Sequence, residues 1–104
     1  MAVKADNNTF DTEISEGEKL VIADFYSDTC IPCKRMSPVL AELEEELADS
    51  VKFVKLNINF DTETAIKYDV TAVPTFVFFK NGEEQTRIVG AVKKAELVDT
   101  INSL

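Results

Sequence analysis

The feature that most constrains this chain is a pair of cysteines, Cys30 and Cys33, separated by two residues. They follow an apolar run, residues 20–26, and open a long amphipathic segment. The run is apolar on both alternating faces apart from Asp24, which is typical of a central strand covered on both sides. A Cys-x-x-Cys at a strand-to-helix junction can form a disulfide and be reduced again. We therefore expect the rest of the chain to be a scaffold for that chemistry.

The spacing of the cysteines suggests separate roles for the two thiols. Helix positions three apart share a face, and their Cα separation of roughly 5–6 Å suits a disulfide. Cys30 is expected at the helix N-terminus, where free N–H groups and the helix dipole stabilise a thiolate, with Lys34 adding positive charge nearby. Cys33, one turn further on, should be more buried. These positions predict that Cys30 attacks a target disulfide and that Cys33 resolves the mixed disulfide. An inert disulfide or two buried thiols is the structural alternative.

Asp24 is a charged residue inside an otherwise apolar strand, so it needs an explanation. Burial would raise the pKa of its carboxyl group, and the chain has no histidine to accept the proton that Cys33 must lose. Lys55, on the next strand along the chain, is the candidate partner of Asp24. We expect Asp24 to accept the proton that Cys33 loses, with Lys55 as the partner of Asp24. The alternative is that Asp24 points outward beside a loop and has no role.

The remaining pattern predicts alternating strands and helices. We expect a short edge strand within residues 2–10, a short helix over residues 10–14 with Asp11 as a possible N-cap and Gly17 after its end, and a helix from Ile31 to near Asp49. A strand over residues 51–58 is followed by a short helix that Asp61 caps. Strands over residues 75–80 and 85–89 flank the hairpin signal Asn81-Gly82, before a C-terminal amphipathic helix. The sum is an α/β fold with a mixed sheet and helices on both faces.

Composition excludes several classes of function. The length of 104 residues, 45% of them hydrophobic, suits a single domain over residues 1–104. A net charge of -8 repels phosphate backbones, so we expect no nucleic-acid partner. No apolar run is long enough to cross a bilayer and no secretory signal is evident, so we expect no membrane partner and a cytoplasmic location. Two thiolates without histidine do not make a metal site in one chain, and we expect no metal and no bound cofactor.

In the order and spacing of several segments, the chain resembles the thioredoxin family. The matching segments are residues 24–26, 30–34, 38, 55–58, 73–75, 79–82 and 89–91. The resemblance covers essentially the whole chain and implies the thioredoxin fold, with about five strands and about four helices. The Cys-x-x-Cys pattern alone is moderately specific, and the downstream Pro-Thr pair and Asn-Gly hairpin make the resemblance strong.

The resemblance also implies how a target would bind. Val73-Pro74 would be a cis peptide bond beside Cys30, where an ordinary trans turn is the expectation from the sequence alone. Pro74 would position the target, whose extended chain pairs with the backbone before this proline. The groove around Cys30 would be formed by Ala72, Val73, Gly90 and Ala91, together with Thr29, Ile31 and Pro32 of the active-site segment. Gly90 has an alternative role as a strand bulge or bend.

Three positions depart from the family's pattern. Thioredoxins usually carry Trp before the first cysteine and Gly after it, where this chain has Thr29 and Ile31. The position after Phe25 is also changed from Trp, to Tyr26, and the chain has no tryptophan. The thiol chemistry needs none of these residues, whereas partner choice and redox poise depend on them.

These observations predict a thiol–disulfide oxidoreductase of the thioredoxin type that reduces protein disulfides. The resemblance implies a separate reductase as electron donor, most simply a flavin-dependent one that uses NADPH, and we expect a monomer. Three alternatives stay open: an oxidase or isomerase with the same fold, a thioredoxin-fold module that binds a partner without catalysis, and a metal or iron–sulfur cluster shared between two chains.

Overall fold

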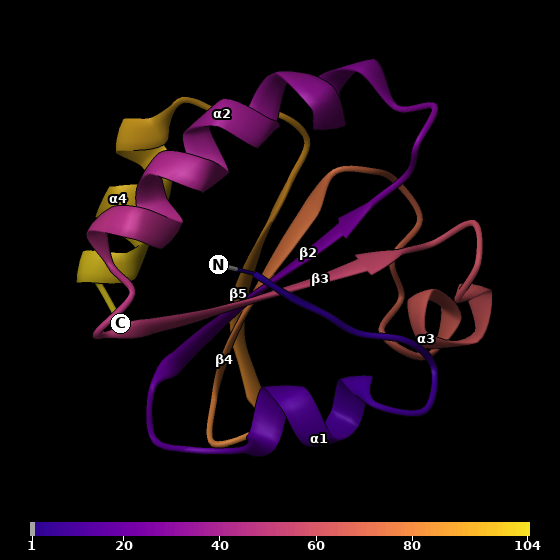
Figure 1. Ribbon diagram of the computed structural model, residues 1–104, viewed down its shortest axis with the longest axis horizontal. Coiled ribbons are helices and arrows are strands. Elements are labelled where there is room, and N and C mark those ends of the chain that lie inside the picture. Colours follow the sequence, from indigo (N-terminus) through magenta and orange to yellow (C-terminus); the bar gives the residue numbers. More distant parts are fainter. Residues whose placement is uncertain (1) are drawn as a thin grey trace.

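The computed structural model describes residues 2–104, and within them five strands form one mixed sheet with four helices on its two faces (Figure 1). In chain order the elements are β1 (Val3–Lys4), α1 (Phe10–Ser15), β2 (Leu20–Tyr26), α2 (Ile31–Glu46), β3 (Val51–Asn57), α3 (Thr62–Lys67), β4 (Thr75–Lys80), β5 (Glu83–Val89) and α4 (Lys94–Asn102). This arrangement confirms the expected α/β fold class. None of these helices is long and apolar enough to span a membrane.

The sheet has the strand order β1-β3-β2-β4-β5, so β2 lies at its centre. β2 pairs in parallel with β3, from Leu20 opposite Val51 to Tyr26 opposite Asn57. On its other side β2 pairs antiparallel with β4, and β4 pairs antiparallel with β5. The expected edge strand is the short β1, which pairs in parallel with β3. The central position of β2 confirms what its apolar pattern predicted.

The two faces of the sheet carry separate hydrophobic cores. α1 and α3 cover one face, and α2 and α4 cover the other (Figure 1). Beneath α1 and α3, the ring of Phe10 packs against Phe25 and Tyr68 at centroid distances of 5.2 and 5.0 Å. The core beneath α2 and α4 consists of Ile22, Met36, Leu40, Leu43, Val51, Phe53, Phe76, Phe78 and Leu97.

Strand alternation places Asp24 on the face that α2 covers. Ile22 belongs to the core beneath α2, and Asp24, two residues further along the same strand, shares its face. The same alternation puts Lys55 on the face of Phe53, which also belongs to that core. Asp24 and Lys55 are direct register partners between β2 and β3. The carboxylate therefore points toward the helix that carries the cysteines.

Two expected boundaries differ by a few residues. α2 ends at Glu46 rather than near Asp49, because the chain turns there and the N–H groups of Ser50 and Val51 both donate to the carbonyl of Leu47. β5 begins at Glu83 rather than at Gln85. Asn81 and Gly82 have φ values of 53° and 79°, and this two-residue turn pairs Glu83 directly with Lys80.

The predicted N-cap at Asp11 is wrong. α1 begins at Phe10, and the N-cap position belongs to Thr9. The carboxylate of Asp6 accepts the N–H groups of Asn8 and Thr9 at 2.8 and 3.0 Å, so the chain turns into the helix before it reaches Asp11. Asp11 lies in the first turn instead, where its charge suits the helix dipole. Gly17, with φ of 78°, follows the end of α1 as expected.

Asp61 occupies the N-cap position of α3, as predicted, but its side chain does not cap the helix. The side-chain oxygen of Asn7 accepts both the N–H and the hydroxyl of Thr64, at 3.0 and 2.7 Å. In exchange, the carboxylate of Asp61 accepts the N–H of Asn7 at 3.1 Å. The capping group for α3 thus comes from a segment more than fifty residues earlier in the chain, because the N-terminal segment runs beside this helix.

Candidate active site

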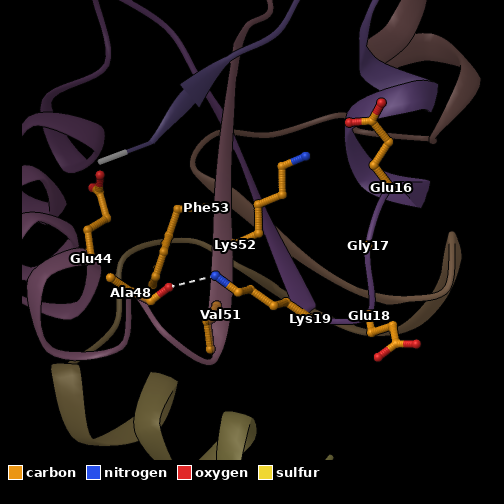
Figure 2. A pocket seen from close by; sticks show the side chains of 9 residues that line it. All are labelled: Glu16, Gly17, Glu18, Lys19, Glu44, Ala48, Val51, Lys52 and Phe53. Atoms are coloured by element: carbon orange, nitrogen blue, oxygen red, sulfur yellow. Dashed lines mark hydrogen bonds between the residues drawn. The ribbon is translucent and has the colours of Figure 1, made fainter.

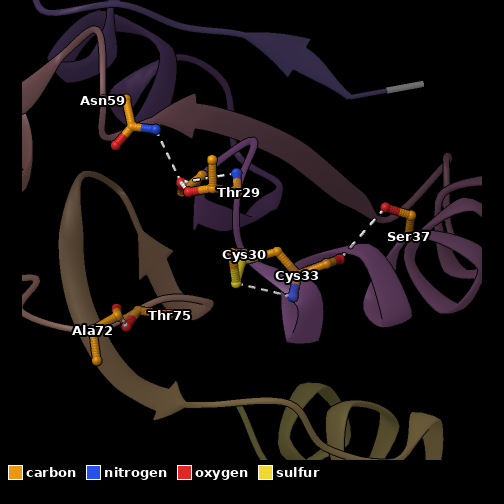
Figure 3. The surroundings of a disulfide bond; sticks show 8 residues. Thr29, Cys30, Cys33, Ser37, Asn59, Ala72 and Thr75 are labelled. Atoms are coloured by element: carbon orange, nitrogen blue, oxygen red, sulfur yellow. Dashed lines mark hydrogen bonds between the residues drawn. A yellow bond between two sulfur atoms is a disulfide. The ribbon is translucent and has the colours of Figure 1, made fainter.

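The two cysteines form a disulfide at the N-terminus of α2, shortly after the end of β2 (Figure 3). Cys30 is the N-cap residue, with extended backbone, and its Sγ accepts the N–H of Cys33 at 3.1 Å. The Cα atoms are 5.2 Å apart, within the range that one helical turn and a disulfide share. Pro32 lies in the first turn, where a missing N–H costs nothing. The position expected for Cys30 is therefore the one observed.

The two sulfurs differ in their access to solvent. Cys33 is buried, with 7% of its surface exposed, whereas Cys30 is only partly buried. Ile31 and Pro32, between them, are exposed, and Ile31 leaves 63% of its surface in solvent. A reagent that approaches from solvent therefore meets Cys30 first.

Asp24 is held beneath the first turns of α2 in a way that disfavours its charge. Its Oδ1 is sealed from solvent and has no hydrogen-bond partner among residues 2–104. Burial raises the pKa of this carboxyl group from 3.8 to about 7; the positive charge of Lys55 opposes the rise and the negative charge of Glu44 adds to it. The alternative that Asp24 points outward beside a loop is wrong. A carboxyl group with this pKa exchanges a proton near neutral pH.

A cavity of about 230 Å³ brings the buried thiol and the buried carboxyl together. Its lining includes Cys33, Asp24, Lys55 and Ser37. A neighbouring hollow of about 400 Å³ shares Asp24, Lys55 and Ser37 with it. Water in these spaces can carry a proton between Cys33 and Asp24, and from Asp24 to bulk solvent. Among residues 2–104 no three acidic or cysteine side chains converge in a way that would hold a metal ion.

The segment before β4 comes to the same edge of the sheet. β4 begins at Thr75, opposite Phe25 near the end of β2, so residues 72–74 lie beside the chain that leads to Cys30. The Val73-Pro74 bond is cis, as the resemblance implied, and Pro74 is buried. The Thr75 hydroxyl donates to the carbonyl of Ala72 at 2.7 Å (Figure 3). The disulfide and residues 72–74 therefore lie at the same end of the sheet.

The structure also brings Gly90 to this segment. The N–H of Gly90 donates to the carbonyl of Pro74 at 2.7 Å, and φ of 95° at Gly90 is in the region that glycine adopts most easily. Val73 is half-buried, and Ala72 and Ala91 are exposed.

Sequence reasoning missed a group of polar residues around the turn that delivers Cys30. Asn57 donates to the carboxylate of Asp28 at 3.0 Å, and its side-chain oxygen accepts the N–H of Asn59. Asn59 in turn donates to the hydroxyl of Ser27, which contacts the hydroxyl of Thr29. A signal was present, because parallel strands end at the same end of a sheet: residues 27–29 follow β2, and residues 57–59 consist of the last residue of β3 and the two residues after it.

A further hollow, of about 470 Å³, lies at the opposite edge of the sheet, where β2 and β3 begin (Figure 2). Two of its lining residues are joined by a hydrogen bond: Lys19 Nζ donates to the carbonyl of Ala48, just after the end of α2, at 3.0 Å (Figure 2). The cysteines lie at the other end of the strands, so this hollow takes no part in their chemistry.

Comparisons with known proteins agree with this geometry. The family model described as Thioredoxin matches residues 1–103. A thioredoxin of Bacillus subtilis is 42% identical over 100 residues, which cover 96% of this chain and 94% of the relative. A thioredoxin of Rickettsia typhi is 39% identical over 90% of both chains. The chloroplastic thioredoxin Y of Oryza sativa is 38% identical over 98% of this chain and 61% of its own length.

Proposed function

Because the chain belongs to the thioredoxin family and is a thiol–disulfide oxidoreductase that reduces protein disulfides, we propose that Cys30 is its attacking thiolate and Cys33 its resolving thiol. The Cys30 thiolate attacks one sulfur of the target disulfide, and the other target sulfur leaves and takes a proton. The Cys33 thiolate then attacks Cys30 Sγ and expels the second target sulfur. The target gains two electrons and the protein ends as the observed disulfide.

The observation that carries this assignment is the N-cap position of Cys30. The Cys33 N–H that now contacts Cys30 Sγ at 3.1 Å is available to a thiolate there, and the helix dipole adds to its stabilisation. Greater exposure of Cys30 allows a target to approach, whereas the buried Cys33 reacts only within the mixed disulfide.

Asp24 is proposed as the group that takes the proton from Cys33, with Lys55 as its electrostatic partner. Both line the cavity that Cys33 lines. A carboxyl group with a pKa of about 7 gains and loses a proton at the pH of a cell, which a solvated aspartate does not do. Lys55 limits how far the pKa rises, so the carboxylate is available to the thiol.

For target binding we propose the groove formed by Pro74 and its neighbours. The backbone of Val73 would pair with an extended target, with Gly90 and Ala91 on the far side. Thr29, Ile31, Pro32 and Ala72 would form the rest of the surface around Cys30. The hydrogen bond from Gly90 to Pro74 supports this proposal, since it joins the two backbone segments that border the groove.

The cellular setting belongs to the same proposal. A separate flavin-dependent reductase that uses NADPH would return the disulfide to the dithiol, which makes the protein a link in electron transport. We place it in the cytoplasm, where dithiols are kept reduced, as a monomer in which residues 1–104 act as one domain.

Trapping tests the assignment of the two cysteines. A Cys33→Ser variant mixed with a disulfide-bonded protein should accumulate a covalent complex through Cys30, detected by mass spectrometry before and after reduction. Cys30→Ser is the matched control and should form none. A complex with the Cys30→Ser variant, or none with Cys33→Ser, would contradict the roles.

The departures at Thr29 and Ile31 favour one competing function, that of an oxidase or isomerase. The reduction potential of the Cys30–Cys33 pair, measured by equilibration in defined thiol buffers, distinguishes a reductase from an oxidase or isomerase. A reduction potential near that of thioredoxin, about -270 mV, supports a reductant, whereas one near that of protein disulfide isomerase, about -180 mV, supports the alternative.

A further inference from the structure

The hydroxyl of Ser27 organises the turn that leads from β2 to Cys30. The N–H of Cys30 donates to the carbonyl of Ser27 at 3.3 Å, and the N–H of Thr29 donates to its hydroxyl oxygen, also at 3.3 Å. The side-chain amide of Asn59 donates to the same oxygen at 3.0 Å. Ser27 leaves only 7% of its surface exposed. The turn is thereby tied to the loop after β3 on one side and to the cysteine on the other.

Counting hydrogens fixes the direction of the remaining contact. A hydroxyl has one hydrogen and two acceptor lone pairs. Ser27 Oγ already accepts two hydrogen bonds, from Thr29 N–H and from Asn59, so its own hydrogen is directed at the hydroxyl oxygen of Thr29, 3.1 Å away. The reverse direction would give Ser27 three donors and leave its hydrogen buried without an acceptor, which is costly.

Because Ser27 is the donor in this contact, the hydrogen of the Thr29 hydroxyl remains available for another hydrogen bond. Within residues 2–104 it has no other partner, and the Thr29 side chain is exposed beside the partly buried Cys30. The oxygen is held in place by Ser27, so the donor is oriented before any target arrives. An oriented donor loses less freedom on binding than a mobile one.

We propose that the Thr29 hydroxyl donates a hydrogen bond to a peptide carbonyl of the target beside its cysteine, and that Ser27 and Asn59 are the residues that position it. A carbonyl is the acceptor that every extended polypeptide offers at this place. The donor selects polypeptide disulfides over small disulfides that lack an acceptor, and it does so at the position where an aromatic surface is missing. This inference rests on the proposed groove and on Cys30 as the attacking thiol.

The test compares two substrates: a disulfide-bonded peptide and cystamine, whose ammonium groups accept no hydrogen bond. Thr29→Val keeps the shape of the side chain and removes the donor. It should lower kcat/KM for the peptide roughly 3- to 10-fold more than kcat/KM for cystamine, which is the value of one net hydrogen bond. Thr29→Ser keeps a hydroxyl and should retain most of the activity.

Ser27→Ala tests the positioning role. It should lower kcat/KM for the peptide by a larger factor than kcat/KM for cystamine. Ser27→Ala combined with Thr29→Val should lose no more of this peptide preference than Thr29→Val alone, because both act through one hydrogen bond. A merely structural effect would slow both substrates equally.

Three results would overturn the inference: wild-type activity of Thr29→Val on the peptide, an equal loss on cystamine, or losses that multiply in the double variant. If Cys33→Ser still traps the same peptide through Cys30 in that event, only the role of Thr29 fails. If it traps nothing, the proposed roles of the cysteines fail first.

Discussion

Replacing Asp24 with asparagine should stabilise the fold in a pH-dependent way. The buried carboxyl group has a pKa of about 7 in the folded protein against 3.8 ordinarily, so between these values the folded state holds a proton that the unfolded state has released. Stability therefore falls as pH rises through this window. Three pH units at about 1.4 kcal/mol each make the cost of ionised Asp24 about 4 kcal/mol at most. Asparagine carries no charge and avoids that cost.

Urea unfolding of the oxidised protein at a series of pH values measures the effect. The difference in unfolding free energy between Asp24→Asn and wild type should be small near about pH 4, grow by about 1.4 kcal/mol per unit, and level off above about pH 7. Asp49→Asn, which removes a carboxylate at an exposed position after α2, is the matched control. A pH-independent difference for Asp24→Asn, or a loss of stability at about pH 8, would refute the reasoning.

The same variant tests the proposed proton transfer. Without the carboxylate, Cys33 should lose its proton more slowly, so the mixed disulfide should persist longer while Cys30 attacks at an unchanged rate. Stopped-flow measurement of target release separates the two steps, and an unchanged release rate would remove Asp24 from the mechanism even if its effect on stability were confirmed.

Two further changes probe neighbouring parts of the argument. Lys55→Met removes the charge that lowers the pKa of Asp24, so the titration midpoint of Asp24, followed by NMR, should move upward. Lys52→Met, on the same strand but ion-paired with Glu13, is the control and should leave the midpoint of Asp24 in place. A downward shift for Lys55→Met would contradict the pairing of Lys55 with Asp24. Asn7→Ala removes the cap of α3 and should cost about 1 to 2 kcal/mol in urea unfolding, whereas Asn8→Ala should cost little; equal effects would show that the cap is not the cause.

The elements that were predictable are those in which one short pattern determines the outcome. β2 is apolar on both faces because both faces are covered, and Asn81-Gly82 adopts positive φ values that few other pairs accept. Cys30 begins α2 because Pro32 suits the first turn and an N-cap residue needs only an acceptor atom, which sulfur supplies. In each case the pattern that predicts the element lies within a few neighbouring residues.

What was missed depends on residues far apart in the chain. Asp61 stands where a capping residue is expected, yet Asn7 supplies the bond, because two segments that meet only in the fold exchange partners. The contact from Asn59 to Ser27 spans 32 positions, and nothing in either segment alone indicates it. Local patterns predict elements and the cysteine chemistry, whereas the polar groups that orient the site follow from tertiary packing.

The sulfur at the start of α2 has a consequence for energetics. The N–H that it accepts belongs to the helix, so the first turn of α2 is completed by an atom whose charge and bonding change in every catalytic cycle. Electrons and protons then act on the fold as bound ligands do, and thermodynamic linkage requires the effect to be mutual. A partner that stabilises this turn in the dithiol form, even one that touches neither cysteine, must stabilise the reduced protein and so make it a weaker electron donor. The affinity of the protein for electrons therefore depends on the stability of the first turn of α2.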